Sequence, residues 1–429
     1  MFKYNNFLDS AIDKLAPQAR EEWLQSLLLE QIRWAIDHET PWIMKKIKDL
    51  GLTKDDFKKI EDRFKLGPFT KKNFRQNGTR NLLPDHTRYA FEHGGAELYP
   101  FERVALTRGA GGTTVKNVKD YTFVIWAQAD WIAAMQASTR GILEEHAQIR
   151  LPARPATNYT IDHVAQPFFS SVIVFNGGTY FPRHVNVSNQ EFFEMLVNEQ
   201  CDGIISPPGT HLLKGKGLDE LILYDWNLDQ PYITKEKIKL VIVSSTPLSK
   251  ELHEEFQKRG IPIKDGGGST DIGAALWNCT ADPLRWHAVE GAVYVEVWDR
   301  NTQRPAEYGQ KGLLVASRIA GVIENEEFRR RYQLLYHVEN ILNQSGQEIP
   351  EFVHSRATEI CGENILSIPQ SKVQSYRVQA YQEYLDSCKI VPNQGSQLIQ
   401  YSGLMNESTW FAPEECGCGK NAKKFHGLE

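Results

Sequence analysis

The sequence predicts an α/β protein with a mostly parallel sheet covered by helices. A strand that ends in a turn at 203–209 and apolar, strand-like runs at 240–243 and 261–263 alternate with helical patterns at 191–200 and 249–259. Strands that alternate with helices in this way are typical of βαβ units. The chain has 429 residues, more than one core usually organises, so we expect two or more subdomains.

The composition argues against several classes of protein. Hydrophobic residues make up 41% and charged residues 24%, as in ordinary globular proteins. The net charge of −5 comes without a basic block, so we expect no nucleic-acid partner. No run of eighteen apolar residues and no signal-peptide pattern is present, which predicts a cytoplasmic protein without membrane association. Six cysteines in so long a chain do not indicate a disulfide framework.

Residues 1–100 are expected to form a helical region that packs on the core and carries no chemistry. Apolar residues recur every four positions from Leu24 to Ile36, as on one face of a helix. The sequence from Thr53 to Asp56 has the pattern of a capping box at the start of a further helix.

A stretch rich in glycine and threonine follows a short strand at 103–107. Its glycines would let backbone N–H groups approach phosphate oxygens. It is not a Walker loop, because no Gly-Lys-Ser/Thr sequence follows, and a tight turn is an equally good interpretation. The candidate nucleotide-binding residues here are Thr107, Gly109, Gly111, Gly112 and Thr113.

An apolar run that ends in an asparagine and two glycines predicts either a buried element with its loop or one wall of a substrate pocket. The first interpretation is the commoner one. A helical pattern from Tyr121 to Gln148, which includes Trp126 and Trp131, precedes the run. The candidate substrate-binding residues are Phe168, Phe169, Asn176, Gly177 and Gly178.

The stretch Asp265–Gly273 carries the strongest functional signal. It reads Asp-Gly-Gly-Gly-Ser-Thr-Asp-Ile-Gly and directly follows the strand at 261–263, so we expect a glycine-rich loop there. Its hydroxyls and N–H groups suit phosphate oxygens, and the carboxylate of Asp271 suits Mg²⁺. A flexible turn without a ligand is the alternative. The candidate nucleotide-binding residues here are Asp265, Gly266, Gly267, Gly268 and Ser269.

The last third of the chain departs from this alternation. Extended runs at 292–298 and 312–317 predict a small antiparallel meander. Residues 321–395 then read as a helical insertion with apolar residues seven apart, namely Phe328, Leu335 and Leu342. Such a face is too apolar to be left in water, so it packs against its own domain or, as the sharper alternative, forms a homodimer surface.

The order of these motifs resembles phenylacetate–CoA ligases, which are adenylate-forming enzymes of the acyl-CoA synthetase superfamily. The resemblance covers nearly the whole chain apart from the insertion. It rests on the stretches at 107–114 and 265–273, on Ser244-Ser-Thr-Pro-Leu-Ser249 and on Glu415-Cys-Gly-Cys-Gly419. It implies the large domain of that superfamily, with layered αβαβα sheets and a small β-subdomain.

Two segments take their roles from this resemblance. Residues 101–320 would be the α/β core that binds the nucleotide and the acyl group, and 396–429 would end the β-subdomain. By resemblance the catalytic residues are Thr270, for a phosphate, and Asp271, for the metal. The segment that would complete the nucleotide site contains Ser244, Ser245, Thr246 and Pro247.

The implied reaction joins a carboxylic acid, either aromatic or otherwise apolar, to AMP. It uses ATP with Mg²⁺ and then passes the acyl group to coenzyme A or another thiol. Two alternatives stay open. The chain could be a degenerate relative that binds an adenylate without turnover, or it could transfer an acyl group to a protein thiol, as acyl-protein synthetases do.

The chain departs from the family pattern at several positions. Thr113 stands where the family has a phosphate-loop lysine. Gly267 replaces a tyrosine that stacks on adenine, a contact that contributes roughly 1 kcal/mol. The sequence Gln400–Leu404 lacks the acid that holds the ribose. The chain ends at Glu429, where the family's mobile C-terminal domain begins, so we expect that domain to be absent from this chain.

A structural zinc ion is expected at Cys279, His287, Cys416 and Cys418. The glycines of Cys-Gly-Cys-Gly let two thiolates turn toward one point, and three thiolates with one imidazole complete a closed tetrahedral site. Members of the phenylacetate–CoA ligase family have a similar Cys…His pair and Cys-x-Cys. The alternative is small buried cysteines and an unrelated histidine. No site is assigned to Cys201, Cys361 and Cys388.

Overall fold

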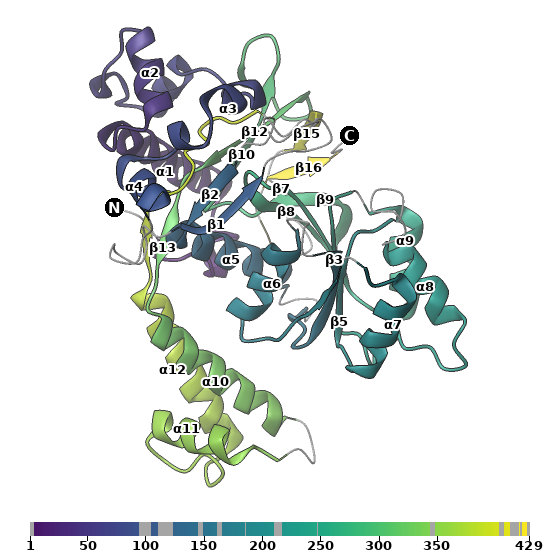
Figure 1. The fold of residues 1–429 in the computed structure, drawn as a ribbon. Helices are drawn as coiled ribbons and strands as arrows, with labels where there is room; N and C mark the ends of the chain where they lie inside the picture. The colour runs from purple at the N-terminus through teal and green to yellow at the C-terminus, as the bar shows by residue number, and fades with distance from the viewer. Residues whose placement is uncertain are drawn as a thin grey trace.

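The computed structural model shows a mixed α/β body from which a group of helices projects (Figure 1). The residues that the structure describes are 4–93, 104–109, 123–144, 149–160, 165–184, 186–209, 217–246, 248–343, 348–402, 407–411, 420 and 423–426.

A twelve-stranded sheet forms the centre of the described chain. One half is parallel, in the spatial order β4 (Phe181–Arg183), β3 (Pro155–Thr160), β5 (Gly203–Ser206), β6 (Leu240–Ser244) and β7 (Ile263–Ser269). The other half is antiparallel, in the order β8 (Gly273–Cys279), β9 (Asp282–Ala288), β16 (Lys424–His426), β15 (Glu407–Phe411), β12 (Lys311–Arg318), β10 (Val293–Asp299) and β11 (Arg304–Pro305). The expected meander of 292–298 and 312–317 is the pair β10–β12.

Helices cover both faces of the parallel half because its strands are apolar on both sides. In β6, Val241 and Val243 join the core beneath helices on one face, whereas Leu240 and Ile242 join the core on the other. The first face carries α7 (Asn189–Asn198), α8 (Leu218–Trp226) and α9 (Lys250–Arg259). The second carries α5 (Gln128–Ile142) and α6 (Ala165–Phe175). The predicted layered α/β fold is therefore confirmed.

The N-terminal region is helical and packs on the antiparallel half. Its helices are α1 (Pro17–Asp37), α2 (Pro41–Asp49), α3 (Lys71–Asn77) and α4 (Asp85–His93). Short segments of tighter helix lie before α1 at η1 (Ser10–Ile12) and between the later helices at η2 (Lys54–Asp56), η3 (Ile60–Lys65) and η4 (Arg80–Leu82). The capping box at Thr53 exists, since its N–H donates to Asp56 at 2.8 Å, but it opens only the turn η2.

The helix expected from Tyr121 begins later than predicted. Residues Phe123–Ala127 form the strand β2, which pairs with β1 (Val104–Gly109), and α5 starts at Gln128. Ser396 takes part on the other side of β2, because its N–H donates to the carbonyl of Ile125 and its hydroxyl accepts from the Ile125 N–H, both at 2.9 Å. Neighbouring chain segments thus satisfy the backbone of β2, which overrides the helical pattern.

The insertion forms a small helical unit with its own core. A two-stranded ribbon of β13 (Gly321–Ile323) and β14 (Lys389–Val391) connects it to the body (Figure 1). Its helices are α10 (Glu326–Leu342), α11 (Glu351–Cys361) and α12 (Gln370–Ser387). Leu335 is buried among these helices, whereas Phe328, near the ribbon, packs against the main core. The sequence did not predict α11.

No helix in the described ranges is both long and apolar enough to cross a membrane.

Candidate functional site

The glycines of the stretch Asp265–Gly273 belong to a strand and not to the loop that we expected. Gly266 and Gly267 lie in β7 opposite Trp277 and Leu276 of β8. A Cβ atom on Gly268 would lie 2.0 Å from the carbonyl oxygen of Gly273, so the two strands approach more closely than any side chain allows. Within this stretch, the residues that line a cavity begin only at Gly268.

The carboxyl ends of β6 and β7 lie side by side, which is where open parallel sheets bind ligands. The Ser244 hydroxyl donates to the Gly266 carbonyl at 2.6 Å, and the Tyr159 hydroxyl donates to the Ser244 carbonyl at 2.6 Å. Ser245 follows with φ of 82°, a left-handed conformation that is strained for a residue with a side chain. Strain of this kind is concentrated at binding sites.

A cavity opens at these strand ends. The described residues that line it are Trp126, Trp131, Ala165, Phe168, Phe169, Ser244, Ser245, Gly268, Ser269, Thr270, Gly273 and Ala274. It brings together candidates from three separate stretches of the sequence. Hydroxyls at the ends of β6 and β7 therefore share one space with aromatic rings from α6, as a site for a ligand with a phosphate and an apolar group requires.

Comparison with solved structures finds a similar fold in a CoA ligase. The chain superposes on 2-hydroxyisobutyryl-CoA ligase in the postadenylation state, in complex with 2-HIB-AMP, with a TM-score of 0.59 and 13% identity over 96% of this chain and 67% of that one. For the same ligase with 2-HIB-AMP and CoA in the thioesterification state, the TM-score is again 0.59 at 13% identity, over 97% and 70% of the two chains. This chain has the fold of a CoA ligase.

The CoA-ligase fold agrees with the resemblance that the motifs indicated, and the likeness at 13% identity concerns the fold. The open conformation of the same ligase gives a similar superposition, with a TM-score of 0.58. No protein-family model matches the chain, and no curated protein matches it. The phenylacetate–CoA ligase subtype therefore stays a prediction.

Three of the substrate candidates lie away from the cavity, at the C-terminal end of α6. The Asn176 amide donates to the Thr139 hydroxyl at 2.8 Å and to the Val172 carbonyl at 2.7 Å, which closes the helix end. Gly177 has φ of 82°, and a Cβ atom on Gly178 would lie 2.7 Å from a methyl group of Ile173. These residues line a different groove against α10. Their positions agree with the loop interpretation.

The carboxylate of Asp271 is turned into the core and does not line the cavity. Asp271 is 4% exposed, and the Tyr401 hydroxyl donates to its Oδ2 at 3.0 Å. Its Oδ1 has no hydrogen-bond partner among the described residues. Burial raises the pKa of Asp271, whereas the charges of Lys71 and Arg318 lower it. Thr270, in contrast, lies at the cavity wall.

Asp265 lies beneath the site and not in it. Its side chain is 2% exposed, and the Leu248 N–H approaches its Oδ2 at 3.4 Å. Burial raises the pKa of Asp265 to about 7. Its own N–H donates to the Asn278 side chain at 2.8 Å, so Asp265 is part of the support under the strand ends.

The remaining nucleotide candidates are placed only in part. Thr107 and Gly109 lie in β1, where Thr107 pairs with Ile125 of β2 next to the cavity residue Trp126. Thr246 is described but does not line the cavity. The candidates Gly111, Gly112, Thr113 and Pro247 lie outside the described residues.

The expected zinc ligands are described only in part. Cys279 ends β8 and His287 lies in the neighbouring strand β9, and both are buried. Strand β16 adjoins β9, with Lys424 opposite His287. Cys416 and Cys418 lie outside the described residues, and within those residues no group of three or more potential metal ligands occurs.

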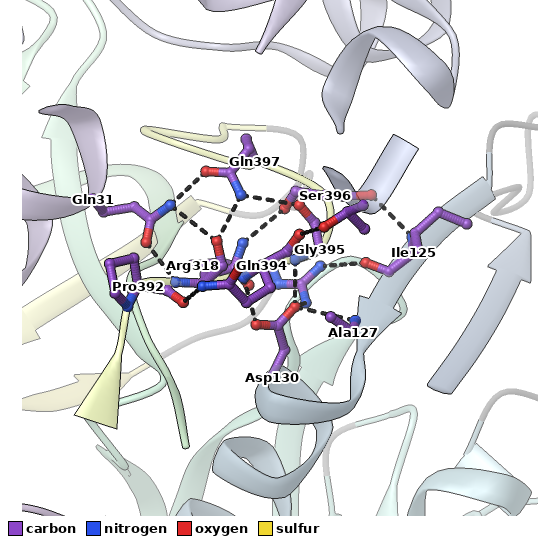
Figure 2. Close-up of polar contacts among 12 residues, drawn as sticks. Gln31, Ile125, Ala127, Asp130, Arg318, Pro392, Gln394, Gly395, Ser396 and Gln397 are labelled. Carbon is purple, nitrogen blue, oxygen red and sulfur yellow. Dashed lines mark hydrogen bonds and ion pairs between the residues drawn. The ribbon is translucent and has the colours of Figure 1, made fainter. Parts of the chain in front are cut away.

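A buried polar network, which sequence reasoning missed, supports one wall of the cavity (Figure 2). Asp130 is 1% exposed and accepts hydrogen bonds from the N–H groups of Gln394 at 2.8 Å and Gly395 at 2.7 Å. Arg318 donates to Asp130 at 3.1 Å and to the carbonyl of Ile125 at 3.1 Å. The segment that returns from the insertion is thereby tied to the start of α5.

This network reaches the cavity through Trp126. The guanidinium carbon of Arg318 lies 3.8 Å from the centre of the Trp126 ring, a cation–π contact. Burial lowers the pKa of Arg318 to about 10, although Asp130 and Asp271 raise it, so the side chain stays charged at neutral pH. The partners are 188 residues apart, and no local sequence pattern indicates the pair.

Proposed function

We propose that this chain is an AMP-forming carboxylate ligase. It would activate a carboxylic acid with ATP as an acyl adenylate and transfer the acyl group to coenzyme A or another thiol. One observation carries the proposal, namely that hydroxyls at the ends of β6 and β7 share a cavity with the aromatic rings of α6. The structural neighbour that the chain superposes on holds 2-HIB-AMP and CoA.

Each part of the cavity would bind one part of the acyl adenylate. The hydroxyls of Ser269 and Thr270 would donate to phosphate oxygens, and the acyl group would lie among Phe168, Phe169 and Trp131. A carboxylate oxygen attacks the α-phosphorus of ATP and pyrophosphate leaves. A thiolate then attacks the acyl carbon and AMP leaves. Mg²⁺, when bound with ATP, would neutralise phosphate charge.

The position of Asp271 favours a second function, binding of an adenylate without turnover. Its unpartnered Oδ1 is the kind of oxygen that Mg²⁺ binds, but the carboxylate is buried against Tyr401 and does not face the cavity. The residues present therefore fit the nucleotide and the acyl group better than the metal.

Calorimetry with AMP, ATP and Mg²⁺ tests the nucleotide site. We expect Thr270→Ala to weaken binding by about tenfold or more, because a hydrogen bond to a charged group contributes about 1.5–3 kcal/mol. Thr302→Ala, at an exposed turn far along the chain from the cavity residues, should bind like wild type. Absence of nucleotide binding to wild type would refute the proposal. Acid-dependent pyrophosphate exchange then separates the ligase from the non-catalytic binder.

We also propose that Cys279, His287, Cys416 and Cys418 hold a structural zinc ion. The support is that two of the four are buried on adjacent strands and that β16, which follows Cys418 by a few residues, adjoins His287. Purified protein should contain one zinc ion per chain, and Cys279→Ser should lower both the zinc content and the melting temperature. Cys361→Ser, in the insertion, is the control. A zinc content near zero in wild type would refute this proposal.

A homodimer formed through the insertion stays a prediction. Leu335 of the expected face is buried in the core of the insertion itself, so a dimer would have to use exposed apolar side chains. These are Phe352, Leu366 and Val378. Light scattering that shows a monomer at high concentration would exclude it.

A further inference from the structure

We propose that Trp131 determines the substrate size of this site, because it closes the small cavity at the strand ends against a much larger cavity behind it. The acid that the site accepts would then be a short aliphatic carboxylic acid, and arylacetic acids would be excluded. This inference rests on the proposed function and names the substrate class for it.

The small cavity limits the acyl group directly. It offers about 80 Å³. A cavity of about 150 Å³ holds one benzene ring, so roughly half that volume has room for about three non-hydrogen atoms. The isopropyl group of a branched four-carbon acid fits this space, whereas the phenyl ring of phenylacetate does not.

The aromatic wall of the cavity has little freedom to open. Trp131 makes edge-to-face contacts with Trp126, at 5.5 Å between ring centres, and with Phe168, at 5.7 Å. Phe168 in turn contacts Phe169 at 5.5 Å. On the opposite side, a Cβ atom on Gly273 would lie 3.2 Å from Phe168 and 3.4 Å from Trp126. Rings that are held by each other and by the backbone of β8 cannot turn aside without losing these contacts.

The larger cavity lies on the other face of α6. It offers about 800 Å³ between α5, α6, β13 and the start of α10. Ile132, Met135, Pro167 and Val322 are among the apolar side chains in its wall. Trp131 is the only described residue that lines both cavities. The indole is therefore the partition between them.

The charge in the larger cavity suits an acyl chain better than a phosphate. Arg329 lies in its wall but is paired with Glu324 at 3.0 Å and lies 3.7 Å from Glu326. It also lies 4.9 Å from the centre of the Phe175 ring. Two carboxylates around one guanidinium repel an anion, so the space behind Trp131 would accept apolar atoms once the partition is removed.

The effect of Trp131 is separable from nucleotide binding. Ser244, Ser245, Ser269 and Thr270 lie at the ends of β6 and β7, whereas Trp131 is on α5. A change at Trp131 should therefore alter the preferred acyl size and leave the affinity for AMP unchanged. A purely structural role for Trp131 would instead lower the affinity for every ligand.

Calorimetry with two stable acyl adenylates, isobutyryl and phenylacetyl sulfamoyl adenosine, tests the inference. We expect wild type to bind the isobutyryl compound at least about tenfold tighter, a difference of about 1.4 kcal/mol. Trp131→Ala should reverse this preference and Trp131→Phe should give an intermediate one, with AMP affinity unchanged in both. Trp226→Ala removes an exposed tryptophan on α8 and should behave like wild type.

Equal binding of the two compounds to wild type, or an unchanged preference in Trp131→Ala, overturns the inference while the proposed function stands. Failure of both compounds and of AMP to bind any variant refutes the proposed function. In that case 4-hydroxybiphenyl, which is larger than the removed indole, tests without a nucleotide whether Trp131 separates the two cavities. It should raise the melting temperature of Trp131→Ala by more than that of wild type, because removal of the indole joins the two cavities. An equal response of the two proteins would show that Trp131 separates nothing.

Discussion

Replacing Asp130 with alanine should destabilise the protein far more than its single charge suggests. The Asp130 carboxylate accepts hydrogen bonds from Arg318, from the N–H groups of Gln394 and Gly395 and, at 3.2 Å, from that of Ala127. Without the Asp130 carboxylate, the guanidinium of Arg318, which is 1% exposed, loses its only ion-pair partner among the described residues. Removing one partner of a buried pair costs about 3–5 kcal/mol, and we expect a loss of that size in the free energy of unfolding.

Urea unfolding of Asp130→Ala, followed by tryptophan fluorescence, measures this loss. The exposed pair Arg356–Glu359, at 2.6 Å, provides the control. Glu359→Ala should cost less than about 1 kcal/mol, because exposed ion pairs contribute little. The double variant Asp130→Ala with Arg318→Met should be more stable than Asp130→Ala alone, since no buried charge is left without a partner. A loss in Asp130→Ala as small as that in Glu359→Ala would refute the reasoning.

Two further predictions concern the strands under the site. Gly268→Ala should cost more than about 3 kcal/mol, because its Cβ would collide with the backbone of Gly273. At Gly309, an added Cβ atom would have no neighbour within 4 Å, so Gly309→Ala carries only the strain of its φ of 86° and should cost about 1 kcal/mol. Equal melting temperatures of the two variants would contradict this account. Wild type should lose stability as the pH rises from about 4 to about 7, and Asp265→Asn should not show this loss. Burial raises the pKa of Asp265 from 3.8 to about 7, so the folded state binds the proton more tightly. The stabilisation is complete below about pH 4 and is lost as the pH rises, by up to about 4 kcal/mol at about 1.4 kcal/mol per pH unit. Parallel stability curves for Asp265→Asn and wild type over that range would show that the carboxyl group does not titrate in this way.

The sequence predicted the parallel half of the sheet because periodicity reports burial directly. Strand β6 and helix α9 begin and end close to the expected positions, since each has apolar residues at its own spacing and Ser249 caps the helix. Strand β2 was missed, because its pairing with β1 and Ser396 depends on residues far away in the chain.

The sequence could predict those site residues whose type alone indicates a chemical role, such as serine hydroxyls that bind phosphate. The hydroxyls Ser244, Ser245 and Ser269 lie together at one cavity, as a phosphate site requires. The glycines Gly266–Gly268 were misassigned to a loop because glycine suits a flexible turn and a close approach of two strands equally well. Arg318 was not foreseen, because its roles depend on partners that only the fold brings near.

The central claim is that the cavity at the ends of β6 and β7 binds an acyl adenylate. A crystal structure of the chain with isobutyryl sulfamoyl adenosine tests this most directly. We predict that the acyl group lies between Phe168 and Trp131 and that the sulfamate, which replaces the phosphate, contacts the turn at Ser269 and Thr270. A ligand bound elsewhere, with this cavity unchanged, would contradict the account.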